Sequence, residues 1–223
     1  MELKGKKLVF LGDSITYGTG KGFTDASYVY WRQLGKYEEC EVHGYGVSGS
    51  RIAKQQTEHQ HAHITEFDDK YFRSRVPEME ENADIVVVLG GSNDYGHGDA
   101  ALGKMEDRTD DTFYGALHCL YSDLLEKYPK ATIVIMTPPH CLEENKLYNG
   151  IGLRNQTNLE GYVNIIKEVA AYYSFPVLDL YRTLGINPQV ELMQALYMPD
   201  GVHPSNHGHT LIYRRLKNFL ENL

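Results

Sequence analysis

Short, continuous apolar segments alternate with longer amphipathic segments along most of the chain. The apolar runs at 85–89 and 133–136 are rich in β-branched residues, which is typical of strands covered on both faces of a parallel sheet. Shorter runs extend the same pattern toward both ends of the chain. Together they predict five strands, at residues 7–11, 41–47, 84–89, 132–136 and 176–180.

The amphipathic segments carry apolar residues at i, i+3 and i+4, which predicts helices between the strands. The clearest patterns run from a cap at Asp110 or Asp111 to Tyr128, from Asn158 to Tyr173, and from Ser205 to Leu220, and weaker patterns cover 28–37 and 76–83. Strands that alternate with helices favour an α/β fold with three layers and a doubly wound parallel sheet. No repeat or linker interrupts the pattern, so we expect a single domain over residues 1–223.

Two long polar segments, 94–108 and 140–156, each follow the C-terminal end of a predicted strand. Ligands bind at that edge of open α/β sheets, so we expect these segments to shape a pocket. The N-terminus begins basic, but its apolar run of four residues at 8–11 is too short for a secretory signal. No segment approaches the roughly 20 apolar residues of a membrane span, so we expect a cytoplasmic protein.

Composition narrows the class of protein further. Hydrophobic residues make up 42% of the 223 residues and the net charge is −8, which favours a compact domain over a nucleic-acid binder. This charge also gives no attraction to anionic lipid. The three cysteines, Cys40, Cys119 and Cys141, are odd in number and widely spaced, so they form neither a disulfide framework nor a zinc pattern.

Four short motifs fall beside the predicted strand ends or before the last helix. Each has a structural interpretation when taken alone: a helix-capping serine, a tight turn, the start of a loop, or a polar loop that caps a helix. Taken together they would place a serine hydroxyl, a glycine N–H, an amide side chain and a histidine at one edge of the sheet. They are Gly12-Asp13-Ser14, Gly46-Val47-Ser48-Gly49-Ser50, Gly90-Gly91-Ser92-Asn93-Asp94 and Asp200-Gly201-Val202-His203.

The last of these motifs pairs a carboxylate with an imidazole three residues later. Asp200 can accept a hydrogen bond from Nδ1 of His203, which leaves Nε2 free to take a proton from a serine. The sequence therefore predicts Ser14 as a nucleophile, His203 as its base and Asp200 as the carboxylate that orients the base.

In this order the four motifs resemble those of the GDSL family of lipases and esterases, in its SGNH-hydrolase form. The resemblance implies a flavodoxin-like α/β/α sandwich with a five-stranded sheet, and ester hydrolysis with no metal and no cofactor. It also implies an oxyanion hole made by the N–H groups of Ser14 and Gly49 and the side chain of Asn93. One position departs from the family pattern, since Gly44 stands where the glycine motif often begins with Asn.

Other residues near the motifs have weaker signals. We expect Asp13 and Asp94 to brace their loops by accepting backbone N–H bonds. His59, His61 and His63 could form a metal cluster, but their polar neighbours favour an exposed loop, and His207 and His209 suit capping or surface positions. Five further residues could contact substrate, with packing or loop surface as the alternative: Tyr17, Tyr45, Tyr95, His97 and His140.

The expected partner is a small-molecule ester. Both long segments are polar and aromatic rather than apolar, which favours a short acyl group such as acetyl, carried by a carbohydrate. An acyltransferase would carry the same motifs. A module that binds a carbohydrate or nucleotide without chemistry would lack one of them, and none is missing. A flavin site is disfavoured because no phosphate loop follows the first strand. The sequence leaves the oligomeric state open.

Overall fold

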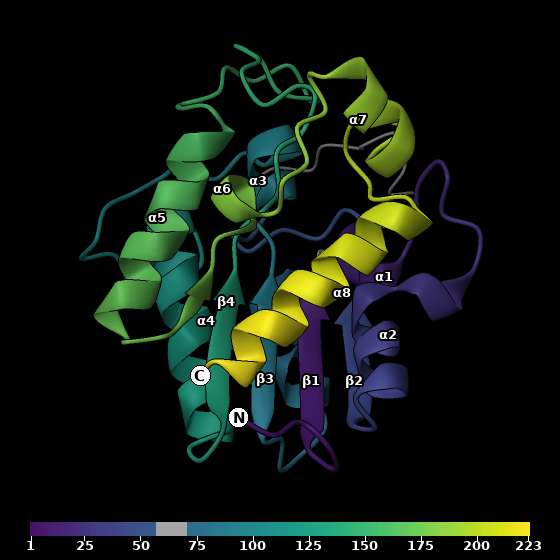
Figure 1. Cartoon of the computed structure of the whole chain (residues 1–223). Coiled ribbons are helices and arrows are strands. Elements are labelled where there is room, and N and C mark those ends of the chain that lie inside the picture. The colour runs from purple at the N-terminus through teal and green to yellow at the C-terminus, as the bar shows by residue number, and fades with distance from the viewer. Residues whose placement is uncertain (57–70) are drawn as a thin grey trace.

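The computed structural model describes residues 1–56 and 71–223, and its centre is a five-stranded parallel sheet in the order β2-β1-β3-β4-β5 (Figure 1). This is the doubly wound, flavodoxin-like order, in which the direction of winding reverses beside β1. The prediction of the fold is confirmed. The strands are β1 (Lys7–Gly12), β2 (Glu41–Gly46), β3 (Ile85–Leu89), β4 (Thr132–Met136) and β5 (Val177–Leu178).

Alternate residues of each strand face opposite layers of helices. In β3, Val86 and Val88 pack in the cluster that includes α4 (Phe113–Lys127) and α5 (Leu159–Tyr172). Val87 faces the opposite cluster, which includes α2 (Tyr30–Tyr37) and α8 (Asn206–Glu221). Figure 1 shows the sheet between these two layers. Both faces are therefore buried, which explains why β3 is continuously apolar instead of alternating.

Side-chain caps set where the long helices begin. Asn158 and Ser205 accept the N–H groups of Gly161 and Gly208, as the sequence predicts for α5 and α8. The prediction of an Asp110 or Asp111 cap was wrong, because Thr112 accepts the N–H of Gly115 and caps α4. Asp110 instead receives a hydrogen bond of 2.9 Å from Arg73.

The least regular segments differ most from their predictions. The expected helix at 76–83 is a 3₁₀ helix, η2 (Phe72–Glu78), which ends just after Pro77. The expected helix at 28–37 is divided into η1 (Ala26–Tyr28) and α2, and the last predicted strand stops at Leu178. The sequence analysis missed four short helices: α1 (Ser14–Tyr17), α3 (Ser92–His97), α6 (Leu180–Thr183) and α7 (Glu191–Tyr197).

The two histidines of α8 lie in different environments. His207 is exposed, as expected, but His209 is 0% exposed, so the prediction of a capping or surface position was wrong for it. His209 shares the helix face of Ile212 and Leu216, which are also 0% exposed. Its ring lies 5.1 Å from that of Phe23, between centroids. The three-to-four-residue spacing of the apolar face thus includes a histidine.

Three further features concern the chain as a whole. Cys40, Cys119 and Cys141 are all free thiols. Among the helices of the described residues, none combines the length and apolar character needed to cross a membrane. The histidine cluster of His59, His61 and His63 lies outside the described residues, so that prediction stays open.

Candidate active site

Ser14 is the first residue of α1 and follows directly on the end of β1. Its side chain is 7% exposed. The preceding Asp13 caps α1 by accepting the Ile15 N–H at 3.0 Å, the kind of bracing contact that the sequence suggests for it. A side chain at position 12 would overlap Thr16, so the glycine there permits the tight turn from strand to helix. The serine is thus held at the C-terminal edge of the sheet.

Asp200 and His203 are held together by a compact turn. Oδ1 of Asp200 accepts the N–H groups of Val202 at 2.9 Å and of His203 at 2.7 Å. Oδ2 lies 3.0 Å from Nδ1 of His203. Gly201, between them, has a φ of +80°, and a side chain there would collide with Leu142. The Asp-Gly-x-His pattern is therefore a requirement of this turn as well as a chemical motif.

The turn brings His203 to Ser14, although the two residues are 189 positions apart in the chain. Nε2 of His203 lies 3.0 Å from Oγ of Ser14. Because the carboxylate of Asp200 can only accept, Nδ1 carries the proton of the neutral ring and Nε2 is the acceptor toward the serine. Serine, histidine and aspartate thus form one hydrogen-bonded line.

The charges along this line shift the pKa values of its members. Burial lowers the pKa of His203, but the hydrogen bond and charge of Asp200, together with the charge of Asp13, outweigh it, and the net pKa is raised. Burial also raises the pKa of Asp200, yet the hydrogen bonds from His203 and Val202 hold it well below its usual range. Burial raises the pKa of Asp13 to about 6. Asp200 therefore stays ionised wherever His203 titrates.

A third segment, which the sequence analysis did not identify, packs against the histidine. A side chain at Gly20 would lie 2.3 Å from Cβ of His203 and 3.1 Å from Oδ2 of Asp200, and its φ is +119°. The next residue, Lys21, donates its backbone N–H to Oδ2 of Asp200 at 3.2 Å. A glycine-rich stretch follows α1 in the sequence, and it was the feature from which this contact could have been suspected.

The predicted oxyanion-hole residues follow the C-terminal ends of β1, β2 and β3. The N–H of Ser14 has no acceptor within α1, because it opens the helix. Gly49 adopts a φ of +75°, a conformation that favours glycine. Asn93, in α3, donates one Nδ2 hydrogen to the carbonyl of Ser50 at 2.9 Å, and its amide nitrogen carries a second hydrogen.

Arg75 of η2 ties these loops together, and the sequence analysis missed it. The buried guanidinium donates to the carbonyls of Gly12, at 2.9 Å, and of Tyr45, and to Oγ of Ser50 at 3.0 Å. Burial lowers its pKa to about 10, and the nearby charge of Asp13 opposes that shift. One cation therefore links the strand end before Ser14 to the loop after β2 that contains Gly49.

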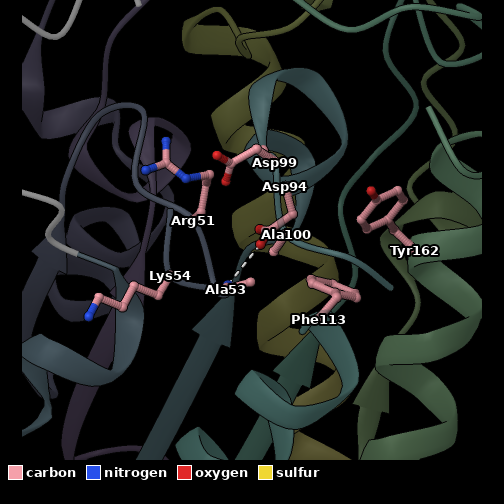
Figure 2. A pocket seen from close by; sticks show the side chains of 9 residues that line it. Arg51, Ala53, Lys54, Asp94, Asp99, Ala100, Phe113 and Tyr162 are labelled. Carbon is pink, nitrogen blue, oxygen red and sulfur yellow. Dashed lines mark hydrogen bonds between the residues drawn. The ribbon is translucent and has the colours of Figure 1, made fainter. Parts of the chain in front are cut away.

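Asp94 stabilises the loop after β2 through two backbone hydrogen bonds. Its carboxylate accepts the N–H groups of Ile52 at 3.0 Å and Ala53 at 2.8 Å, and burial raises its pKa to about 6. Figure 2 shows Asp94 among the residues that line a small pocket, with the bond to Ala53 as a dashed line and with Phe113 and Tyr162 to one side. No member of the Ser14, His203, Asp200 line contributes to this pocket.

The five residues proposed to contact substrate lie in different settings. Tyr17 is 62% exposed, at the end of α1, and His140 is half-buried with Nδ1 2.7 Å from Oε2 of Glu144. Tyr95 is buried, and its hydroxyl donates to the carbonyl of Glu143, which ties the 140–156 segment to α3. The Tyr45 hydroxyl accepts the N–H of Glu80, and the buried His97 contacts Asn93.

The chain also matches known proteins along its sequence and in its fold. A model of the GDSL-like lipase/acylhydrolase family matches residues 10–211, nearly the whole chain. The chain belongs to this family. Membership holds despite Gly44, where a side chain would overlap the ring of Trp31, which accounts for the departure from the family pattern. No curated protein sequence is a match for the chain.

Solved structures with the GDSL-like fold align over the full length. One crystal structure is 30% identical with a TM-score of 0.83, and covers 100% of this chain and 99% of its own. A protein from Lactobacillus plantarum is 28% identical with a TM-score of 0.81, over 99% of this chain and 98% of its own. A carbohydrate acetylesterase family member from Sinorhizobium meliloti shares the fold at 19% identity, with a TM-score of 0.67 over 97% and 98%.

Proposed function

We propose that this protein is a serine hydrolase that cleaves a small carboxylic ester, with Ser14 as nucleophile, His203 as general base and Asp200 as the orienting carboxylate. The observation that carries the proposal is the pair of 3.0 Å contacts that join Ser14 Oγ to His203 Nε2 and His203 Nδ1 to Asp200 Oδ2. A serine hydroxyl is a weak nucleophile at neutral pH, and a base held in this way activates it.

The reaction has two halves that use the same groups. Ser14 Oγ attacks the ester carbonyl carbon while its proton passes to Nε2 of His203, and Asp200 stabilises the imidazolium. The oxyanion accepts hydrogen bonds from the N–H groups of Ser14 and Gly49 and from Nδ2 of Asn93. As the ester C–O bond breaks, His203 returns the proton to the leaving alcohol. Water then attacks the acyl-enzyme with His203 again as base, which releases the acid and frees Ser14.

The proposed substrate carries a short acyl group, such as acetyl, on a carbohydrate alcohol. Two segments that follow the C-terminal ends of β3 and β4 support a short acyl group, because 94–108 and 140–156 are polar and aromatic and do not offer a long apolar surface. They are also bound to each other, since Gly150 N–H donates to the carbonyl of Gly96 at 2.7 Å. Tyr17, three residues after the nucleophile, offers an exposed ring for a sugar. The printed name of the Sinorhizobium meliloti structure is in line with the same substrate class.

The first test removes the nucleophile. Ser14→Ala should abolish both turnover of a short-chain nitrophenyl ester and covalent labelling by a fluorophosphonate probe. Ser74→Ala is the matched control, because the hydroxyl of this serine of η2 bonds, among the described residues, only the carbonyl of Tyr71. Wild-type turnover in Ser14→Ala would rule out the proposed mechanism.

A second test addresses the substrate. The kcat/KM of nitrophenyl esters should fall as the acyl chain lengthens from acetyl, and acetylated sugars should be turned over. A profile that rises toward long chains would contradict the short-acyl proposal while leaving the catalytic line intact. Product analysis with an added sugar acceptor separates hydrolysis from acyl transfer.

A further inference from the structure

A row of hydrogen bonds continues from Asn93 away from the nucleophile. Oδ1 of Asn93 lies 3.2 Å from Nε2 of His97, one helical turn later in α3. Nδ1 of His97 in turn lies 3.2 Å from Nη1 of Arg51. The His97 and Arg51 residues are each 7% exposed, so this end of the row is shielded from water, whereas Asn93 is half-buried. At its other end, Asn93 donates to the carbonyl of Ser50.

The chemistry of the row fixes the tautomer of His97. A guanidinium can only donate hydrogen bonds, so Nδ1 of His97 must accept from Arg51. The neutral ring then carries its hydrogen on Nε2, and this N–H donates to Oδ1 of Asn93. Arg51 thus ensures that the ring nitrogen that faces the asparagine, Nε2, is the one that carries the hydrogen.

The tautomer in turn fixes the orientation of the Asn93 amide. Rotating that amide by 180° would exchange its oxygen and its NH₂ group. Nδ2 would then face the N–H of His97, and Oδ1 would face the carbonyl of Ser50, so donor would meet donor and acceptor would meet acceptor. The observed orientation alone satisfies both neighbours, and it leaves the second Nδ2 hydrogen for the oxyanion.

We propose that His97 is a positioning residue, which holds the Asn93 amide in the orientation that the oxyanion hole requires. The inference rests on the proposed ester hydrolysis, since it gives Nδ2 of Asn93 a role in the transition state. His97 acts through Asn93 and does not touch the substrate. Arg51 acts one step further away, by holding the His97 tautomer.

A double-mutant cycle tests this order of action. His97→Leu should lower kcat for a short-chain nitrophenyl ester roughly tenfold, the equivalent of one lost hydrogen bond, with KM unchanged. Asn93→Ala should lower kcat by about 10²–10³. In the Asn93→Ala background, His97→Leu should cause no further loss, because the group that it positions is absent.

Two variants guard against a general loss of structure. His97→Gln should recover most of the lost rate, because its amide can accept from Arg51 and donate to Asn93. His118→Leu is the matched control, since this histidine is also buried but bonds the hydroxyl of Tyr173 instead, and it should leave kcat unchanged. A Gln variant as slow as the Leu variant would contradict the proposal.

Other outcomes separate this inference from the proposed function. Activity in Ser14→Ala would remove the ester-hydrolase proposal itself. With Ser14→Ala inactive, an equal loss from His97→Leu in both backgrounds, or a rise in KM alone, would overturn only the role of His97. The tautomer gives a readout on the unmodified enzyme: ¹⁵N NMR of histidine-labelled protein should show His97 neutral and protonated on Nε2. A proton on Nδ1 would overturn the inference.

Discussion

The pKa of His203 sets the lower pH limit of the proposed activity. The ring is a base only when neutral, so kcat/KM should rise with pH as His203 loses its proton. The motif alone suggests a midpoint near the usual value of about 6.5. Asp200 and Asp13 favour the charged ring and raise its pKa, so the midpoint should lie above that value.

A pH series from 5 to 9 with a short-chain nitrophenyl ester checks this prediction. Asp200→Asn removes the main charge that favours the imidazolium, so the midpoint should shift to lower pH and the plateau should fall. Glu41→Gln, which alters an exposed carboxylate beside His43, is the control and should leave the midpoint in place. A midpoint below about 6.5 in the unmodified enzyme would contradict the raised pKa.

Single residues show what the sequence can and cannot reveal about the site. Ser14, Asp200 and His203 stand in short local motifs, and the motif order identifies the segments that the fold brings together. Arg75 stands in no such motif, and Gly20 is marked only by the glycine-rich stretch after α1. Both residues contact segments far away in the chain, so their roles become visible only in the folded structure.

At the scale of elements, we expect substitutions in the loop after α1 to lower activity as substitutions in the turn around Ser14 do. Gly20→Ala would place a methyl group against Cβ of His203 and force a side chain to adopt a φ of +119°. Displacing a catalytic group by about 1 Å can cost about 100-fold in rate. We therefore expect kcat for a nitrophenyl ester to fall by about that factor in Gly20→Ala.

Gly5→Ala is the control for the backbone strain. Gly5 also has a positive φ, of +74°, but nothing lies within 4 Å of the added methyl group. Gly5→Ala should lose about 1–2 kcal/mol of stability in urea unfolding from backbone strain alone, Gly20→Ala should lose more because of the added contact with His203, and only Gly20→Ala should lose activity. Equal activity in the two variants would show that the loop does not position His203.

Within the 3₁₀ helix η2, we expect Arg75 to affect both activity and stability, and we expect Arg73 to have little effect on either. Arg75→Met removes the charge-assisted hydrogen bonds to the carbonyls of Gly12 and Tyr45 and to Oγ of Ser50, which should cost about 3 kcal/mol of unfolding free energy and also lower kcat. Arg73→Met, two residues earlier, removes only ion pairs with Asp110 and Asp123 near the surface, which are worth about 1 kcal/mol or less. Equal effects of the two substitutions on kcat would refute a positioning role for Arg75.

The helices and strands that bury many apolar residues were predicted well, and those that bury few were missed. The strands β3 and β4 are buried on both faces and begin or end within a residue of their predicted bounds. By contrast, α7 has no buried residue and α1 has only four residues, so neither shows a periodic pattern. The helix expected at 76–83 failed because its apolar spacing continues past Pro77, where the backbone turns out of the helix.

For the whole molecule, the doubly wound topology decides where chemistry can occur. All strands of the sheet are parallel, so the loops after β1, β2 and β3 meet at one edge. The turn before α8 then delivers His203 to the same edge from the end of the chain. α8 is anchored by a face that includes Ile212, Leu216 and Leu220, all 0% exposed. The position of the base thus depends on the packing of the last helix.

That packing also includes His209, which should make the folded molecule sensitive to acid. His209 is 0% exposed, and neither ring nitrogen has a hydrogen-bond partner among the described residues. Burial, together with the charge of His203, lowers its pKa to about 3. The unfolded chain takes up this proton near pH 6.5, whereas the folded protein does not. Stability should therefore be lost as pH falls from about 6.5 toward 3.

His209→Phe should remove this part of the pH dependence. Urea unfolding at pH 7 and pH 5 gives the change in unfolding free energy for each protein. The wild type should lose about 2 kcal/mol more than the variant between these pH values, since each unit below the unfolded pKa costs up to about 1.4 kcal/mol. His207→Phe, an exposed position on the same helix, should behave as the wild type does. Because the comparison uses the change with pH, a difference in packing at pH 7 does not affect it. Parallel pH curves for wild type and His209→Phe would show that the buried ring finds a proton acceptor at low pH.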